Sequence, residues 1–257
     1  MGTDAMVETS ASTVWGSRLC WAAIGLCGLA LLLILISGPG TRMGLFGFRL
    51  GLLVYVGAVL LTVLALVAGL AGLGMTRGTA GGSPMLLAWG AVIVSALLSW
   101  NNFNWYQMAR SVPPIHDITT DTTNPPAFVD VLPLRADAAN PPEYQGAEIA
   151  DQQTAAYPDI VPIETDASPA SVYAAALKSV ESLGWALAGS DEASGRVEAT
   201  DTTFWFGFKD DVVIRITPTA DGSRVDVRSK SRVGLGDIGT NAARVRSFRD
   251  QLLAEIG

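Results

Sequence analysis

The sequence predicts three N-terminal transmembrane helices followed by a C-terminal α+β domain, a two-layer sandwich of an antiparallel sheet and two helices. Two observations support this prediction. Hydrophobic residues make up 49% and charged residues only 16% of the 257 residues, which is too apolar for an ordinary soluble protein. The long uncharged runs all lie before residue 111, whereas the residues after 168 show the periodicities of helices and strands.

Charge divides the chain into a membrane region at 1–110, an acidic proline-rich arm at 111–167 and a domain at 168–257. Five arginines and two acids give the first region +3, one arginine and ten acids give the arm −9, and eleven bases and twelve acids give the domain −1. Ten of the 13 prolines lie between 111 and 169, which predicts an extended connector without a core of its own. The net charge of −7 argues against nucleic acid as a partner.

Three segments are long and apolar enough to cross a lipid bilayer, which is therefore the first expected partner. Leu19–Ile36 has 18 residues without a charge, Leu50–Leu73 has 24, and the third runs from about Met85 to Trp100 and on towards Tyr106. None contains an acid, lysine or histidine, which argues against an ion pathway. Aromatic side chains suited to the headgroups lie near the expected ends, namely Trp15, Trp21, Trp89, Trp100, Trp105 and Tyr106.

The arginines beside the spans leave the orientation open. Arg18 and Arg77 would lie on one side of the membrane, and Arg42, Arg49 and Arg110 on the other. We interpret the first span as a retained anchor, because its apolar run is longer than the core of a signal peptide.

No metal site or cofactor is expected. Cys20 and Cys27 lie on one face of one predicted helix, where we interpret them as small packing residues. His116 is the only histidine and falls in a loop, and a lone loop histidine is an ordinary surface residue far more often than a metal ligand.

The arm repeats one short pattern. Asn124-Pro125-Pro126 and Asn140-Pro141-Pro142 are each followed two residues later by an aromatic residue, Phe128 or Tyr144. Proline pairs hold the backbone extended. The pattern leaves two alternatives open, a solvated tether or an arm that docks on its own domain or on a partner.

The domain reads as helix, strands and helix. Ser168 and Pro169 form the start of a helix that Gly184 ends, and a second helix is expected from about Thr240 to Ile256. Both helices are expected on one face of the sheet. The four expected strands lie near 185–188, 195–200 running into 203–208, 212–217 and 224–230.

The second face of the sheet is the predicted functional surface. Strand alternation places five side chains there, on a face that we expect to be open to solvent: Trp205, Arg215, Arg224, Asp226 and Arg228. Arginines around an indole would suit an anion or a headgroup. The alternative is a set of structural cross-strand pairs such as Arg215 with Asp226.

The glycine-rich loop Gly234–Gly239 has the spacing GxGxxG but does not predict a dinucleotide site. The chain lacks the following strand with its ribose-binding acid, and Asp237 would repel a pyrophosphate. Asp237 or Thr240 is instead expected to cap the last helix. Residues 224–249 hold seven bases and two acids, and a helix N-terminus beside them would suit a phosphate or carboxylate.

Catalytic groups are few. Asp210 and Asp211 are adjacent in a strand and so point to opposite faces, which makes them a poor acid/base pair. Ser229 and Ser231 have no histidine in the domain to activate them.

Three segments, Phe204–Val212, Arg228–Gly234 and Asp237–Asn241, resemble the family called domain of unknown function 1499. The resemblance covers residues from about 160 to 257 and implies no established activity. It implies signature positions at Asp211, Arg215, Arg228, Ser229, Ser231, Arg232, Asp237, Asn241 and Arg244.

The spans, the Pro-Pro-Ile-His-Asp arm and the domain together resemble a membrane-anchored proteobacterial branch of that family. This resemblance implies a multi-pass protein of the bacterial inner (cytoplasmic) membrane with a periplasmic C-terminal domain.

The preferred hypothesis is a non-enzymatic envelope module that binds a protein partner or an anionic ligand. The alternative is an envelope hydrolase that uses Asp211 or Asp237. The candidate binding residues are Trp205, Arg215, Arg228, Ser229, Ser231, Arg232, Asp237, Asn241 and Arg244.

Overall fold

The computed structural model describes residues 11–76 and 83–257, which form two compact units. The first comprises Met1–Gln107 with Trp205–Gly207, and the second Met108–Phe204 with Phe208–Gly257. Arg77 and the acids Asp4 and Glu8, which entered the charge and orientation analysis, lie outside the described residues.

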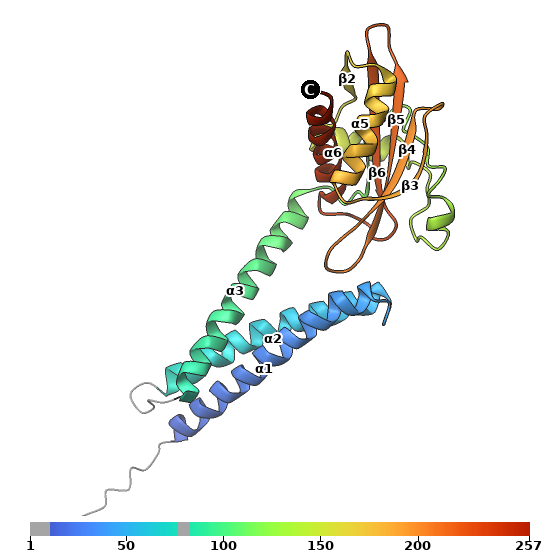
Figure 1. Ribbon diagram of the computed structural model, residues 1–257. Helices are drawn as coiled ribbons and strands as arrows, with labels where there is room; N and C mark the ends of the chain where they lie inside the picture. Colours follow the sequence, from blue (N-terminus) through green and yellow to red (C-terminus); the bar gives the residue numbers. More distant parts are fainter. Residues whose placement is uncertain (1–10, 77–82) are drawn as a thin grey trace, which may run out of the picture. The chain divides into compact units, whose positions relative to one another are not determined.

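Three long helices are each long and apolar enough to cross a membrane, as the sequence predicts: α1 Ala11–Arg42, α2 Phe48–Met75 and α3 Ser83–Ser111. Helices α1 and α2 lie side by side (Figure 1). Their buried residues are mostly small, among them Gly16, Ala23 and Ala30 of α1 and Ala58, Ala65 and Gly69 of α2. A Cβ atom at Gly72 would lie 2.8 Å from the Cys20 main-chain nitrogen, so only glycine allows this approach. Cys20 and Cys27 are buried free thiols in this packing, as expected.

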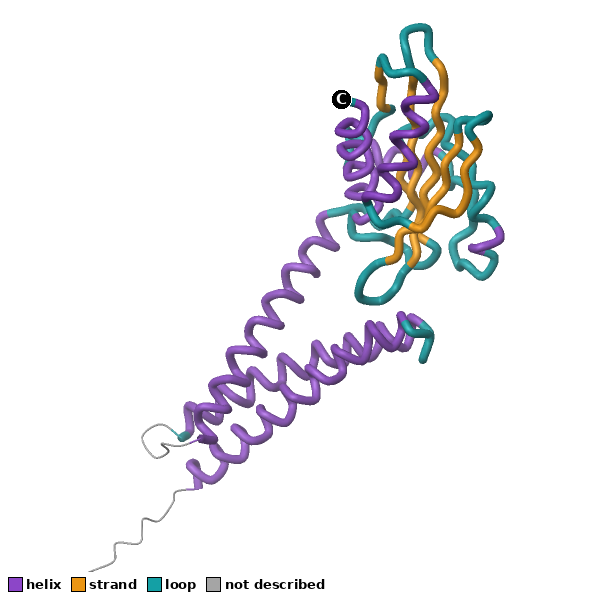
Figure 2. The backbone as a smooth tube through the Cα atoms, in the orientation of Figure 1, coloured by secondary structure: helices purple, strands orange, loops and turns teal. Residues whose placement is uncertain are grey.

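The second unit is built on an antiparallel sheet, drawn in orange in Figure 2. It has six strands in the order β1-β6-β5-β4-β3, with β2 also paired to β6. Strand β6 therefore has β5 on one side and both β1 and β2 on the other. The strands are β1 Asp117–Thr119, β2 Ile163–Thr165, β3 Ala186–Asp191, β4 Arg196–Thr202, β5 Lys209–Pro218 and β6 Ser223–Ser231.

Helices α5 Pro169–Ser182 and α6 Thr240–Ile256 cover one face of this sheet, which confirms the predicted two-layer arrangement (Figure 1). The Ser168 hydroxyl accepts a hydrogen bond from the Ser171 main-chain N–H at 3.3 Å, which caps α5. The main core lies between the layers. It includes Val172, Val180, Val212, Ile214, Ile216, Val225, Val227, Val245, Phe248 and Leu252.

One predicted strand is wrong. Residues 203–208 do not continue β4 but form a turn, in which the Thr203 N–H donates to the Phe208 carbonyl at 2.8 Å. Gly207 takes a positive φ of 69°, which suits a turn and not a strand. Trp205 consequently lies in this turn and not on a sheet face.

The arm differs most from its prediction, because residues 111–167 belong to the second unit and are not a separate connector. They supply β1, β2, the 3₁₀ helix η1 Pro133–Arg135 and the helix α4 Ala147–Ala156. The buried Gln153 side chain bonds both main-chain groups of Thr119, accepting from N–H at 2.9 Å and donating to the carbonyl at 2.7 Å. Of the two alternatives, docking on its own domain is therefore the one the structure shows.

Candidate functional site

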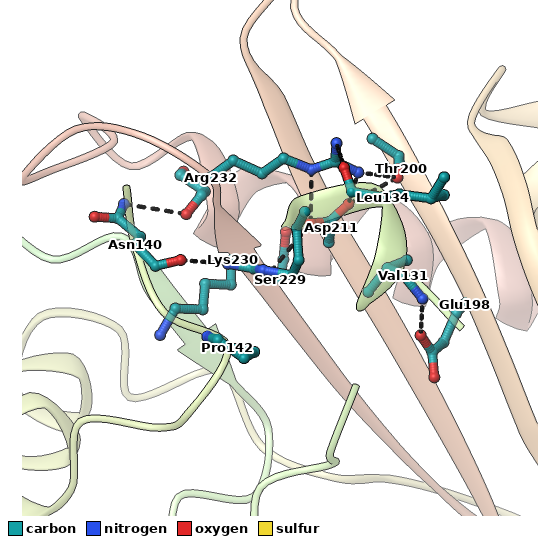
Figure 3. Close-up of polar contacts among 12 residues, drawn as sticks. Val131, Leu134, Asn140, Pro142, Glu198, Thr200, Asp211, Ser229, Lys230 and Arg232 are labelled. Carbon is teal, nitrogen blue, oxygen red and sulfur yellow. Dashed lines mark hydrogen bonds and ion pairs between the residues drawn. The ribbon is translucent and has the colours of Figure 1, made fainter. Parts of the chain in front are cut away.

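The face of the sheet opposite α5 and α6 carries most of the predicted arginines, but it is not open to solvent. Residues 120–146, here called the covering segment, supply hydrogen-bond partners across it (Figure 3). Arg228 is 2% exposed and Lys230 0% exposed, whereas Arg215 and Arg224 are partly exposed. The prediction of an open face is therefore wrong, because a segment at least 66 residues away in sequence covers it.

Asp117 is the first charged anchor of this face. It lies on β1 directly opposite Lys230 of β6. Its carboxylate accepts two hydrogen bonds from the Arg228 guanidinium, Nε and Nη2, each at 2.8 Å, and one from Lys230 Nζ at 2.8 Å. Burial lowers the pKa of Lys230, and the adjacent Asp117 charge opposes that shift.

Asp211 of β5 is the second anchor (Figure 3). The Arg232 guanidinium donates to both of its oxygens, at 2.9 and 2.7 Å, and Arg135 Nη1 donates at 3.1 Å. The Thr200 hydroxyl of β4 donates to the same carboxylate at 2.7 Å. Both carboxylate oxygens of Asp211 are thus held by donors inside the protein.

The two aromatic residues that follow the repeated Asn-Pro-Pro pattern, Phe128 and Tyr144, lie beside the buried guanidinium groups. Phe128 lies 4.8 Å from Arg228 and 5.2 Å from Arg135, measured from each guanidinium carbon to the ring centre. The Tyr144 ring lies 5.5 Å from Arg228. Burial, together with the Asp117 charge, raises the pKa of Tyr144 to about 12. The repeated Asn-Pro-Pro pattern therefore places aromatic rings against cations.

These six charged residues form what we call the cation cluster: Arg135, Arg228, Lys230 and Arg232 with Asp117 and Asp211. Within the described residues the cluster has two more positive than negative charges. Five further hydrogen bonds run from these cations to neutral carbonyls of the covering segment. Arg228 donates to the carbonyls of Pro126 at 3.1 Å and Pro142 at 2.8 Å. Arg135 donates to the Asn140 carbonyl at 3.0 Å and Lys230 to the Glu143 carbonyl at 2.7 Å. Arg232 donates to the Leu134 carbonyl.

The surplus of positive charge affects the pKa of Arg135. Burial and the neighbouring Arg232 and Arg228 lower its pKa, although Asp211 opposes the shift. Among the described residues, its Nε atom is buried and has no hydrogen-bond partner.

Glu198 of β4 attaches the covering segment at a further point. Its buried carboxylate accepts the main-chain N–H groups of Val129 at 2.8 Å and Val131 at 2.9 Å, and Figure 3 shows the bond to Val131. Arg196 lies 3.1 Å from the same carboxylate and 3.2 Å from Asp130. Burial raises the pKa of Glu198 despite these donors.

The expected cross-strand pair is confirmed. Arg215 Nη2 lies 2.7 Å from Asp226, and the two residues are directly opposite each other on β5 and β6. Arg224 contacts the same carboxylate at 3.0 Å, and both arginines also contact Asp121 of the covering segment at 3.1 Å.

Other predicted residues lie on the helix side of the sheet and do not join the cation cluster. Arg244 of α6 pairs with Asp201 at 2.7 Å and Asp210 at 2.8 Å. Asn241 accepts from the Ser229 hydroxyl at 2.6 Å and donates to the Ser231 hydroxyl at 2.9 Å. The candidate residues therefore divide between two faces.

The N-cap residue of α6 is Gly239, and the expected capping bond comes from the side chain of Asp237, two residues before it. Its carboxylate accepts the main-chain N–H groups of Gly239 at 2.8 Å and Asn241 at 2.7 Å, at the start of α6. Burial raises the pKa of Asp237, but both of its oxygens are already engaged.

The two adjacent acids considered for catalysis, Asp210 and Asp211, both form ion pairs. Asp210 and Asp211 point to opposite faces, as predicted, and each is paired with arginine. No group of three or more His, Cys, Asp or Glu side chains able to hold a metal occurs among residues 11–76 and 83–257. A cavity of about 290 Å³ lies elsewhere, between Tyr173, Glu192 and Ile216, and none of the candidate residues lines it.

Sequence reasoning missed Asp117, Arg135, Lys230 and Glu198. Asp117 and Arg135 lie in the arm, which was treated as lacking a core. Charge could have indicated that the arm packs on the domain. The arm carries a net charge of −9 and lies next to a domain whose basic residues are concentrated near its end.

Comparison with protein families gives a match. A family model described as "Protein of unknown function (DUF1499)" matches residues 117–252, which is 136 of the 257 residues. The match begins at Asp117 and so includes the covering segment, whereas the resemblance from sequence began near residue 160. No match was found among curated proteins.

Replacing Asp117 by Asn should destabilise the second unit by about 3–5 kcal/mol, because Arg228 and Lys230 would keep their charges without a counterion. Chemical denaturation of the full chain in detergent measures the loss. Asp137→Asn changes an exposed carboxylate of the covering segment and should have little effect. Equal effects of the two substitutions would contradict the assigned role of Asp117.

Proposed function

The chain belongs to the family of proteins of unknown function DUF1499, and we propose that it is a membrane-anchored, non-enzymatic module whose cation cluster binds an anionic group. This group is a carboxylate or phosphate, carried either by a small ligand or by a protein partner. Membrane anchoring is supported by the three long apolar helices.

The observation that carries this proposal is the charge surplus of the cation cluster. Four cations face two carboxylates, and five of their hydrogen bonds go to main-chain carbonyls of the covering segment. A hydrogen bond from a cation to an anion is stronger than one to a neutral carbonyl. An anionic group that reaches these donors therefore has an electrostatic advantage over the carbonyls now bound.

Arg232 is the most exposed cation of the cluster, and we expect an anion to reach the cluster there. Its side chain is 12% exposed, whereas those of Arg135, Arg228 and Lys230 are 1%, 3% and 0% exposed. It also contacts Leu134, a half-exposed residue of η1. Displacing the carbonyl of Leu134 would free one guanidinium donor without breaking the pair between Arg232 and Asp211.

The hydrolase alternative draws no support from its two proposed residues. Asp211 is bound by two arginines and a threonine, and Asp237 caps α6 with both oxygens. Neither carboxylate lines the cavity beside Tyr173.

A test of anion binding uses inorganic phosphate as the probe and the full chain in detergent. Phosphate should raise the melting temperature above that in chloride at equal ionic strength, by roughly 2–4 °C per kcal/mol of binding free energy. Arg232→Gln should remove this increase, and Arg246→Gln should keep it, because Arg246 pairs with Asp159 outside the cluster. An unchanged phosphate effect in Arg232→Gln, or none in the natural sequence, would contradict the proposal.

The proposed location is the bacterial inner membrane, with the second unit on the periplasmic side. This follows from the resemblance to membrane-anchored family members. A reporter enzyme that is active only outside the cytoplasm, fused after Gly257, should be active in cells. Activity confined to a reporter that works only in the cytoplasm would contradict this orientation.

A further inference from the structure

The loop between β6 and α6 exposes two apolar side chains. Leu235 is 87% exposed and Ile238 is 38% exposed. Ile238 also adopts a φ of +54°, a left-handed conformation that is unfavourable for a β-branched residue. Glycine or asparagine would fit this backbone at lower cost, so the chain places an apolar side chain here despite an unfavourable conformation.

The same loop packs on the residues that follow α3. The Asp237 N–H donates to the Ile115 carbonyl at 3.1 Å, and His116 Nδ1 lies 3.3 Å from the Leu235 carbonyl oxygen. A Cβ atom at Gly236 would lie 3.0 Å from the Cα atom of Pro114, so the loop backbone closely approaches this part of the chain. Leu235 is therefore fixed beside Pro114 and Ile115 within the second unit.

Residues 114 and 115 follow closely in the chain after the end of α3. Helix α3 has 29 residues and is about 43 Å long, which matches a bilayer of about 40–45 Å including its headgroups. Only residues 112–116 separate Ser111 at the end of α3 from Asp117 of β1. Six residue steps span at most about 20 Å, so Pro114 and Ile115 lie within a few residues of the headgroups.

We propose that Leu235 and Ile238 form a lipid contact in the headgroup region of the bilayer that α3 crosses. An apolar side chain held at the membrane surface gains by leaving water, which accounts for an exposed leucine beside a strained isoleucine. The contact would restrict the second unit at the membrane. It is independent of anion binding, because neither residue belongs to the cation cluster.

The test uses the full chain in nanodiscs of phosphatidylcholine and phosphatidylglycerol. Cys20 and Cys27 are replaced by Ala, and a nitroxide spin label is attached through Leu235→Cys. Collision with oxygen, which concentrates in lipid, is compared with collision with a water-soluble nickel chelate. The control is Leu253→Cys, an exposed leucine near the far end of α6.

The label at 235 should show a several-fold higher ratio of oxygen to nickel accessibility than the label at 253. Adding Ile238→Asp should reduce this ratio towards the control, because a carboxylate resists insertion. Equal ratios at 235 and 253 would overturn the proposal. Loss of access to both reagents at 235 would also overturn it, because the loop would then be covered by protein and not lipid.

Discussion

The fold of the second unit depends on the buried pairing of Asp117 with Arg228 and Lys230. Unpaired charges are very costly to bury, so strand β6 can carry two buried cations only if β1 brings Asp117 beside them. Once β1 is in place, the covering segment must cross the same face of the sheet, where its carbonyls and aromatic rings complete the remaining contacts. The sheet and the arm are therefore one folding unit.

Ion pairs between the arm and the domain also explain part of the difference in charge between these two regions of the sequence. Four acids of the arm pair with arginines of residues 168–257: Asp117 with Arg228, Asp121 with Arg215 and Arg224, Asp130 with Arg196, and Asp159 with Arg246. Proline suits this arm because it has no N–H to leave unsatisfied, while its carbonyl still accepts a hydrogen bond. Four of the ten acids of the arm thus form ion pairs within the second unit, and the surplus of cations in the cation cluster is the basis of the proposed anion binding.

Features that depend on residues close together in the sequence were predicted correctly. The span of α6, the Asp237 cap and the Arg215–Asp226 pair followed from helix and strand periodicity, and all are present. The pairing of β1 and β2 with β6 was not predictable in this way, because each has three residues and β1 meets its partner more than 100 residues later. The turn at 203–208 was missed because its aromatic residues resemble a strand, although Gly207 ends that pattern.

Hydrogen exchange at the Val129 and Val131 amides tests most directly whether the arm is part of the folded unit. These two N–H groups lie outside any strand, and the buried Glu198 carboxylate accepts both. Their exchange in the full chain should be as slow as that of amides in β5 and β6, because both groups are released only when the arm leaves the sheet. Exchange at the rate of an unstructured peptide would show that the arm is a tether and would contradict the account.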